Sequence, residues 1–328
     1  MDEKTTPRIQ SIGVLTSGGD APGMNAAIRA VVRTGNFYGL KVYGIRKGYQ
    51  GLIRGEMEVL NNRSVSETLQ RGGTILQTAR SKEFQTEEGM AKAISMARVF
   101  DVDAVVVIGG DGSYRGALDL SRKGLPVIGL PGTIDNDIGC TEYTIGYDTA
   151  MNTAMQAIDK LRDTASSHER CSVIEVMGRG AGYIAVNVGM ANGAEIVLIP
   201  EQEVDFDRDV LKVMLEARNR GKKHFIVIVA EGKGDAIEIA ARIEATTGIE
   251  SRATILGHIQ RGGSPTERDR VMASLMGVRG VEALVQGRLN RIVSVQCGKV
   301  VDIDIEEAMA MKKEIDPDQL RAAHILSL

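Results

Sequence analysis

Short apolar runs alternate with amphipathic stretches along most of this 328-residue chain. Runs rich in Val, Ile and Leu, typical of buried strands, lie at 9–15, 104–108, 127–130, 171–177, 196–199, 225–229 and 253–256. Apolar positions at helical spacing or other helix signals mark 24–38, 87–100, 114–121, 147–163, 207–220, 236–247 and 266–287. The alternation of strands and helices predicts an α/β protein with doubly wound parallel sheets and helices on both faces.

Three of the predicted strands run directly into glycine-rich loops, with the sequences TSGGDAPG, GGDGS and PGTIDND. Glycine allows backbone N–H groups to approach a ligand, and a helix that follows presents the positive end of its dipole to an anion. Parallel strands carry their carboxyl ends at one edge of a sheet, so the three loops are expected to share that edge. The pattern favours a site for a polyphosphate.

Carboxylates in these loops indicate metal and proton-transfer chemistry. Asp111 would repel a phosphate unless a hard cation such as Mg²⁺ bridges the two, so Asp111 is a predicted metal contact. Asp135 and Asp137 lie two residues apart, and an extended loop would point both to the same side, where one could accept a proton. We expect Asp111 and Asp135 to share one crevice.

A plain strand-to-helix turn is the alternative for each glycine loop, because glycine permits a sharp turn in many α/β proteins. No GxxxxGK[ST] sequence is present, and Arg115 replaces the last glycine of a GxGxxG fingerprint. The functional interpretation therefore depends on the loops taken together and not on a generic nucleotide motif.

Several further segments carry basic groups or local signals. Arg29 and Arg33 lie four residues apart on one helical face, which suits either a bound anion or solvent. Arg179 lies between two glycines in a turn, where its fork-shaped guanidinium could hold phosphate oxygens. Residues 48–63 are expected to be irregular, 166–170 to form a loop, and a Ser-x-x-Glu capping box predicts a helix at 64–70.

Composition excludes several other classes of protein. A net charge of −3 and the absence of Trp disfavour nucleic-acid binding, and no apolar run is long enough for a membrane span. Three scattered cysteines suit neither a disulfide scaffold nor a CxxC metal site. The polar start MDEKTTPRIQ contains no signal-peptide core, so we expect a cytoplasmic protein.

Five motifs together, SGGDAPGMNA, IGGDGS, PGTIDND, MGRGAG and HIQRGGSP, make the chain closely resemble ATP-dependent 6-phosphofructokinase of the bacterial, allosteric type. The similarity runs from about Ile9 to about Ala310. It implies a glycolytic kinase that converts fructose 6-phosphate to fructose 1,6-bisphosphate with ATP and Mg²⁺. It also implies two interleaved doubly wound, Rossmann-like α/β domains, with 1–145 plus 258–310 binding ATP and 146–257 plus 311–328 binding the sugar phosphate. In such a fold the chain crosses between domains near Gly146, Gly257 and Met311.

The resemblance also implies a role for each matching residue. Asp135 would be the general base, with Thr133 and Arg179 stabilising the transferring group and Asp137 in support. The residues implied for ATP are Gly19, Arg80, Ser81, Gly110, Asp111, Gly112 and Ser113, with Asp111 on Mg²⁺. The residues implied for fructose 6-phosphate are Thr133, Ile134, Asp135, Arg170, Met177, Gly178, Arg179, Glu231, Arg252, His258, Ile259, Gln260 and Arg261.

A homotetramer with shared active and effector sites is implied as well, because family members receive Arg170 and Arg252 from a neighbouring subunit. The residues that match an effector site for ADP or phosphoenolpyruvate are Arg29, Arg33, Arg162, Gly193, Glu195, Lys222, Lys223 and His224. The family usually has an effector-binding Arg just before its SVS segment. Here Asn62 followed by Arg63 departs from that pattern, which puts effector affinity and identity in question.

Two alternatives stay open beside the ATP-dependent kinase. A pyrophosphate-dependent relative on the same fold would carry side chains at the positions of Gly112 and Gly132, and both are glycine here. A non-catalytic regulatory subunit would be expected to lose Asp135, Asp111 or Arg170, and all three are present. Lipid and NAD kinases share GGDG loops but have no reason to carry the PGTIDND and HIQRGGSP segments.

Overall fold

The computed structural model describes residues 9–327, which fall into two compact units. The first unit comprises 9–134, 138–149 and 261–313, and the second comprises 135–137, 150–260 and 314–327. The chain therefore passes between units around 149, 260 and 313, a few residues beyond the crossings expected from the resemblance, and also makes a three-residue excursion at 135–137. Most of the polar start segment lies outside the described residues.

The first unit is built on a seven-stranded sheet with the order β11-β10-β5-β4-β1-β2-β3. The central five strands are parallel, and the edge strands β3 and β11 pair antiparallel with β2 and β10. The strand bounds are β1 Ser11–Thr16, β2 Lys41–Ile45, β3 Met57–Leu60, β4 Ala104–Gly109, β5 Val127–Pro131, β10 Arg291–Gln296 and β11 Lys299–Asp304. The expected parallel pairing of 104–108 with 127–130 is confirmed, and β1 lies inside the sheet as expected.

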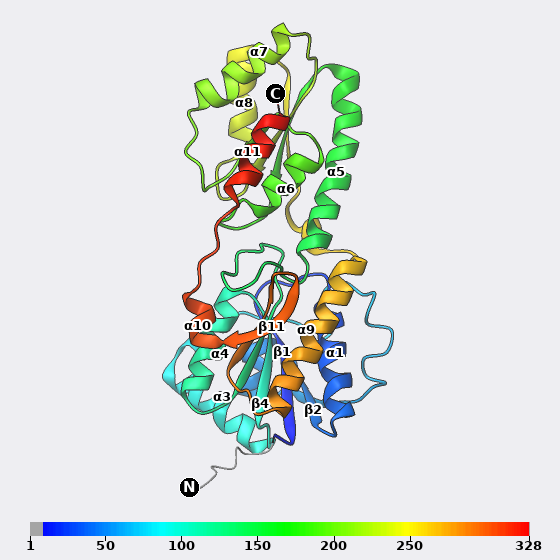
Figure 1. Ribbon diagram of the computed structural model, residues 1–328, viewed down its shortest axis with the longest axis vertical. Helices are drawn as coiled ribbons and strands as arrows, with labels where there is room; N and C mark the ends of the chain where they lie inside the picture. The colour runs from blue at the N-terminus through cyan, green and yellow to red at the C-terminus, as the bar shows by residue number, and fades with distance from the viewer. Residues whose placement is uncertain (1–8, 328) are drawn as a thin grey trace. The chain divides into compact units, whose positions relative to one another are not determined.

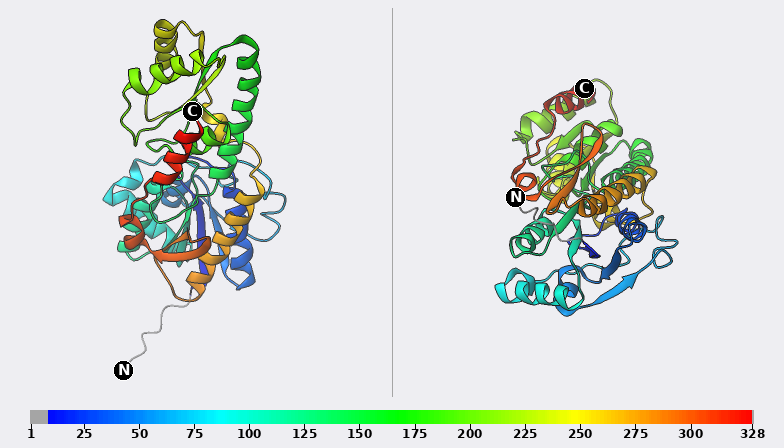
Figure 2. Two further views of the ribbon diagram at one scale, coloured as in Figure 1. Left: turned by 45° about the horizontal axis from the view of Figure 1, so that its top comes forward. Right: turned by 60° about the horizontal axis from the view of Figure 1, so that its bottom comes forward.

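Helices cover both faces of this sheet. The bounds are α1 Met24–Phe37, α2 Gly48–Arg54, α3 Glu87–Val99, α4 Asp111–Arg122, α9 Glu267–Val285 and α10 Ile305–Ala310. α1 and α9 lie side by side on one face, and α3 and α4 lie on the other (Figures 1 and 2). The helices α1 and α9 approach closely because Gly277 has no side chain; a Cβ there would lie 2.6 Å from the Cβ of Ala30.

The second unit contains a four-stranded, wholly parallel sheet with the order β7-β8-β6-β9. Its strands are β6 Cys171–Val176, β7 Ile196–Leu198, β8 Phe225–Ala230 and β9 Ser251–Ile255. Its helices are α5 Tyr147–His168, which starts in the first unit, α6 Tyr183–Ala191, a π-helical turn Asp207–Lys212, α7 Val213–Asn219, α8 Ala236–Thr247 and α11 Pro317–Leu326. Met214 of α7 and Ile243 of α8 pack with Phe225 in one apolar core.

Four local predictions were wrong. Residues 48–60 are not irregular but form α2 and β3. The helix α5 continues to His168, so most of the loop expected at 166–170 is helical. The helix expected at 64–70 is a series of turns, in which the side-chain oxygen of Asn61 accepts from the backbone N–H groups of Arg63 and Ser64. The helix α4 begins at Asp111 and not at Tyr114, so part of the GGDGS segment is helical.

Among residues 9–327, none of the helices combines the length and apolar character that crossing a membrane requires.

Candidate functional site

The three glycine loops of the first unit meet at the carboxyl edge of its sheet. The N–H of Ser17, after β1, donates to the carbonyl of Ile108 in β4 over 3.0 Å, and the N–H of Gly132, after β5, donates to the carbonyl of Gly109 over 3.0 Å. A Cβ on Gly18 would lie 3.4 Å from Ser113 Oγ. The expectation of one shared edge is therefore confirmed within this unit.

Glycine is required where these loops touch. A Cβ on Gly109 would lie 2.5 Å both from the carbonyl oxygen of Ser17 and from Ser113 Oγ, a distance that real Cβ atoms do not tolerate. The segment that carries Arg80 joins the same group, because Thr78 Oγ1 donates to the carbonyl of Gly18 over 2.8 Å.

The helices that start at the glycine loops lack side-chain caps. Gly23 precedes α1 and Gly110 precedes α4, and neither can supply a side-chain acceptor. By contrast, Thr86, Asp235 and Thr266 cap α3, α8 and α9 through their side-chain oxygens. No side chain therefore occupies the starts of α1 and α4, although the N–H groups of Met24 and Ser113 donate to the carbonyls of Ala21 and Gly110. The positive dipole ends of the two helices suit an anion.

Asp111 is the first residue of α4 and is partly exposed. Its side chain is 36% exposed, and its Oδ2 lies 2.8 Å from Arg115 Nη2. Among the described residues no group of three or more His, Cys, Asp or Glu side chains could hold a metal. A single carboxylate at a helix start without a side-chain cap fits a Mg²⁺ ion that is bound mainly by phosphate oxygens and water.

Gly112 and Gly132 differ in the space around them. A Cβ on Gly112 would meet nothing within 4 Å, so a side chain there would project into open space beside Asp111. A Cβ on Gly132 would lie 3.0 Å from Ile108 Cγ2 and 3.2 Å from the terminal methyl carbon of Met24. Only the first position leaves room for a side chain without movement of its neighbours.

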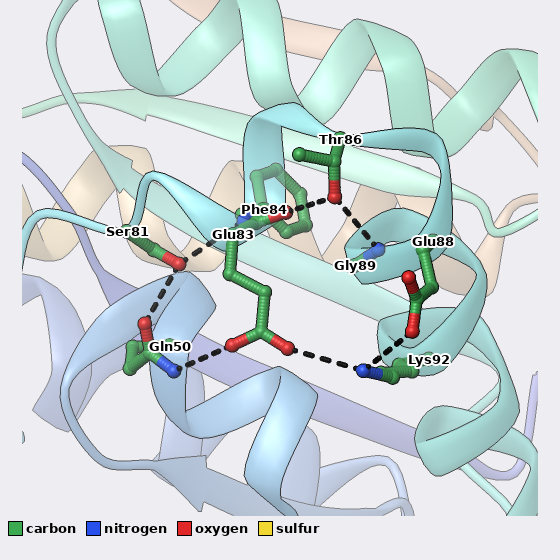
Figure 3. A network of polar contacts seen from close by, with 8 residues as sticks. All are labelled: Gln50, Ser81, Glu83, Phe84, Thr86, Glu88, Gly89 and Lys92. Atoms are coloured by element: carbon green, nitrogen blue, oxygen red, sulfur yellow. Dashed lines mark hydrogen bonds and ion pairs between the residues drawn. The ribbon is translucent and has the colours of Figure 1, made fainter.

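A polar network holds the segment that contains Arg80 and Ser81 (Figure 3). Ser81 Oγ donates to Gln50 Oε1 over 2.8 Å and accepts from the N–H of Phe84 over 3.2 Å. Gln50 Nε2 donates to Glu83 over 3.4 Å, and Glu83 in turn accepts from Lys92 over 3.4 Å. The hydroxyl of Ser81, predicted to bind ATP, thus takes part in holding its own loop, while Arg80 is exposed.

The neighbouring residue Tyr49 connects this network to the β4 loop. Its hydroxyl donates to the carbonyl of Ser113 over 2.5 Å, and its ring stacks on Phe84 with centroids 4.0 Å apart. Burial, with a smaller contribution from Asp119, raises the pKa of Tyr49, so the hydroxyl keeps its proton and remains a donor. Tyr49 and Gln50 of α2 therefore tie together two segments predicted to bind ATP.

The PGTIDND segment is buried. Asp135 is 6% exposed and Thr133 is also buried, and a Cβ on Gly110 would lie 3.6 Å from Thr133 Cβ, which places Thr133 against the β4 loop. Asn136 adopts φ 52°, so the loop is not extended and the expectation that Asp135 and Asp137 point to one side loses its basis. Because residues 135–137 belong to the second unit, a crevice shared by Asp111 and Asp135 stays a prediction.

Four predicted substrate residues meet at the carboxyl end of β6 in the second unit. The N–H of Arg179 donates to Glu231 Oε1 over 2.6 Å, and the N–H of Met177 donates to Gln260 Oε1 over 3.4 Å. Gly178 adopts φ 146° and Arg179 adopts φ 60°, so the turn depends on the glycine. The contact with Glu231 fixes the backbone of Arg179 and does not involve its guanidinium.

Arg170 and Arg252 lie at the opposite end of the same sheet. Arg170 Nε is 2.7 Å from Glu250 Oε2 and Arg252 Nη2 is 2.6 Å from Glu250 Oε1, and these contacts, that of Arg170 above all, lower the pKa of Glu250. The six residues of β6 separate Arg170 from Met177, so the two lie seven residue steps apart, a length of about 23 Å at about 3.3 Å per residue. Within one chain the two arginines therefore do not join the group around Met177.

The HIQR segment is divided between the units. His258 and Ile259 are exposed and belong to the second unit, as does the fully buried Gln260. Arg261 belongs to the first unit, where its Nη1 donates to the carbonyl of Asp20 over 3.1 Å, beside Gly19.

The predicted effector residues also divide between units. Arg29 and Arg33 lie on α1 of the first unit. In the second unit, Arg162 Nη2 donates to the carbonyl of Asn192 and contacts that of Gly193 over 3.5 Å.

A groove of about 490 Å³ in the second unit is lined by Lys222, Lys223 and Glu250, among others. Lys222 forms an ion pair with the buried Glu195, and Lys223 pairs with Glu169 at 2.7 Å. His224 follows them directly. Asn62, at the position that departs from the family pattern, accepts from Asn36 Nδ2 over 3.3 Å in the first unit.

Sequence reasoning missed three residues of these sites. Glu250 could have been noticed as an acid two positions before Arg252 at the start of a strand. Tyr49 and Gln50 carried no local signal, since their partners lie 31 to 64 residues away in sequence.

Comparison with known proteins gives consistent matches. Residues 11–284 match the family model described as phosphofructokinase. The protein named ATP-dependent 6-phosphofructokinase from Clostridium botulinum (strain Hall / ATCC 3502 / NCTC 13319 / Type A) is 56% identical over 319 residues, which cover 97% of this chain and 100% of that protein. The protein of the same name from Alkaliphilus metalliredigens (strain QYMF) is 52% identical over 320 residues, covering 98% of this chain and all of the relative.

Solved structures agree in fold. Phosphofructokinase from Saccharomyces cerevisiae superposes with a TM-score of 0.87 at 34% identity, covering 97% of this chain and 48% of the yeast chain. A pyrophosphate-dependent phosphofructokinase from Marinobacter aquaeolei superposes with a TM-score of 0.84 at 20% identity, a level at which only the fold is compared.

Proposed function

Since this chain belongs to the phosphofructokinase family, we propose that it transfers the γ-phosphoryl group of ATP to the 1-hydroxyl of D-fructose 6-phosphate. The products are fructose 1,6-bisphosphate and ADP, and the reaction is a phosphotransfer of glycolysis. The observation that carries the proposal is the meeting of the three glycine loops with the uncapped starts of α1 and α4 at one edge of the first unit's sheet.

The first unit binds ATP in this proposal. The start of α4 and the backbone around Gly19 face the triphosphate, and Asp111 would hold the Mg²⁺ that accompanies the nucleotide. When bound, the ion neutralises charge on the phosphate oxygens. Tyr49 and Gln50 fix the distance between the Ser113 loop and the Arg80 segment, so that the two sides of the nucleotide site keep one geometry.

The second unit supplies the groups for the sugar phosphate. Asp135 accepts the proton of the 1-hydroxyl as it attacks, and Arg179 and Thr133 stabilise charge on the transferring group. Burial of Asp135 keeps water from competing for this carboxylate. Asp137 supports Asp135, and Met177, Glu231 and Gln260 shape the sugar site.

The 6-phosphate is held by His258 and Arg261 together with arginines from a second copy of the chain. Along β6 at about 3.3 Å per residue, Arg170 lies about 23 Å from Met177, and Arg252, which pairs with Ser172, lies about 17 Å from it; these lengths support their delivery to another subunit's site. Glu250 orients both guanidinium groups toward that role. A homotetramer with shared active sites follows, with ADP or phosphoenolpyruvate bound at the effector residues of α1 and of the Lys222 groove.

ATP is the proposed phosphoryl donor because of the space at Gly112. A Cβ at Gly112 would meet nothing within 4 Å, so the absence of a side chain leaves space that a bound nucleotide can occupy. The pyrophosphate-dependent alternative is tested by measuring initial rates with fructose 6-phosphate and either ATP or pyrophosphate, each with Mg²⁺. We expect turnover with ATP only. Equal or faster turnover with pyrophosphate would reject the ATP assignment, and no turnover with either donor would favour a regulatory subunit.

A further inference from the structure

Three arginines in the first unit surround one buried carboxylate, away from the glycine loops of that unit. Asp302 of β11 has a side chain that is 1% exposed. Its Oδ1 lies 2.6 Å from Arg279 Nη2 and 3.0 Å from Arg288 Nη1, and its Oδ2 accepts from Arg291 Nε over 3.2 Å. The main-chain oxygen of Asp302 accepts a fourth contact, from Arg291 Nη2 over 2.9 Å.

The fold brings these residues together from three elements. Arg279 lies on α9, Arg288 in the turn that follows it, and Arg291 is the first residue of β10. In the antiparallel β10–β11 pair, Asp302 is opposite Val293, two positions from Arg291 and therefore on the same face of the sheet as Arg291. The cluster thus sits at the amino-terminal end of β10, which runs parallel to β5. It lies at the edge of the sheet opposite to the glycine loops.

The cluster holds more positive charge than its carboxylate balances. Guanidinium groups stay protonated in proteins, so three of them face one carboxylate. Within residues 9–327, Asp302 is the only acidic residue that forms an ion pair with any of the three. Asp304, opposite Arg291 in the strand register, uses its Oδ1 to cap α10 through the N–H of Glu306 over 2.9 Å.

Several guanidinium nitrogens in the cluster are buried without an acceptor. Arg279 Nε, Arg288 Nε and Arg288 Nη2 have no hydrogen-bond partner within the described part of the chain. Leaving a buried, charged donor unpaired is costly, and arginine forks match the oxygens of phosphate-type anions. Nevertheless the side chains of Arg279, Arg288 and Arg291 are 35%, 34% and 28% exposed, so a small ion can reach the cluster.

We propose that Arg279, Arg288 and Arg291 form a binding site for a phosphate-type dianion, with Asp302 holding the three side chains in place. Two surplus positive charges suit a doubly charged tetrahedral oxyanion better than a monovalent ion. Inorganic phosphate and the phosphoryl group of a small phosphorylated metabolite share this chemistry. The site is separate from the nucleotide edge and requires no group from the second unit.

Isothermal titration of the full-length protein with inorganic phosphate tests the site, at constant ionic strength set with sodium chloride. The predicted active and effector sites also contain arginines, so the comparison is between variants. Arg288→Met is expected to lose one phosphate per protomer or to weaken it at least about tenfold, in line with a lost charge-assisted contact. The matched control Arg122→Met removes an arginine from an exposed pair with Glu306 in the same unit and should titrate as the unchanged protein does.

A second variant separates anion binding from a purely structural cluster. Asp302→Asn removes the carboxylate that balances and holds the three arginines, so in a binding site phosphate takes over that charge balance and should raise the variant's melting temperature more than that of the unchanged protein. If the cluster is purely structural, Asp302→Asn should lower the melting temperature by the same amount in phosphate as in chloride. That result, or an unchanged titration of Arg288→Met, would reject the proposal.

Crystals of the unchanged protein soaked in selenate provide a test that does not depend on any variant folding. We expect an anomalous peak between Arg279, Arg288 and Arg291, and peaks only elsewhere would reject the site.

Titration with glucose 6-phosphate in place of inorganic phosphate distinguishes the two sources of the ligand. A sugar phosphate that binds as tightly as phosphate, and loses affinity in Arg288→Met, would identify a phosphorylated metabolite.

Discussion

The two units hold their predicted binding residues in opposite ways. In the first unit, segments from β1, β4, β5 and α2 all converge on one edge of the sheet through direct contacts. In the second unit, the residues predicted for one substrate occupy both ends of β6, with Arg179 at one end and Arg170 at the other. In the proposed function, the nucleotide half would therefore be assembled within a single chain, whereas the sugar-phosphate half would need a second copy.

This contrast separates two kinds of substitution. If the proposal holds, changes at the nucleotide edge act within the protomer that carries them, and changes at Arg170, Arg252 or Glu250 act on a neighbour. It also explains why glycines are common at the nucleotide edge of the first unit, whereas Arg170, Arg252 and Glu250 form ion pairs. Backbone N–H groups position a nucleotide only if loops pack closely, while long side chains are needed to reach across a subunit boundary.

The largest expected effect is that of Asp135→Asn. Loss of the proton acceptor should lower kcat by about 10³-fold or more, because positioned general bases contribute about 10²- to 10⁴-fold and orientation adds to that. Steady-state kinetics and equilibrium binding of ATP check this, with binding expected to change little. A variant that kept most of its turnover would show that another group accepts the proton.

Mixed oligomers test the division of the sugar-phosphate site. Asp135→Asn and Arg252→Ala chains should each form weakly active homo-oligomers. Hybrids should recover activity at least about tenfold above either parent, since some sites then combine an intact Asp135 with an intact Arg252 from another chain. Activity is measured on hybrids separated by a charged tag. Hybrids no more active than a mixture of the two parents would mean that each chain completes its own site.

Gly112→Asp tests whether the open space at this position is used by ATP. The position has open space, so folding should be unaffected, but a carboxylate beside the triphosphate should raise KM for ATP by about tenfold through like-charge repulsion. Gly112→Asn has the same shape without the charge and serves as the control. If both variants raise KM equally, bulk and not charge limits ATP at this position.

The smallest expected effect belongs to Gln50→Leu. It removes the acceptor of Ser81 Oγ and loosens the Arg80 segment, so KM for ATP should rise about two- to tenfold, the value of one hydrogen bond, while kcat stays nearly constant. Lys92→Met, which removes an exposed contact of the same network and leaves Gln50 and Ser81 in place, should retain most of the ATP affinity. A fall in kcat with unchanged KM would contradict a role in positioning ATP.

Local signals predicted some elements well. The helix predicted at 236–247 has those bounds in the structure, because Asp235 caps its start and Gly248 with φ 71° ends it. The same kind of signal failed at Ser64, where Asn61 captured the backbone N–H groups that a helix would have used. A capping pattern is reliable only when no competing side chain lies just before it.

Longer-range features were less accessible. The β10–β11 hairpin was not predicted, although Cys297 and Gly298, with φ 49° and 70°, form a two-residue turn that its sequence could have indicated. The glycine loops could be predicted because the residues of each loop are contiguous in the sequence, as in GGDGS and PGTIDND. The Asp302 cluster and the Tyr49 and Gln50 contacts arise from packing of distant segments, which no local pattern records.

The interleaved path of the chain has a consequence for synthesis on the ribosome. β5 is buried between β4 and β10 in the finished sheet, yet β10 begins at residue 291, after nearly the whole second unit has emerged. Until then the nascent chain carries an unpaired, apolar strand edge at Val127–Pro131. The sheet of the first unit, begun before that of the second, is thus completed after it, and β10 then covers the edge that would otherwise recruit other chains.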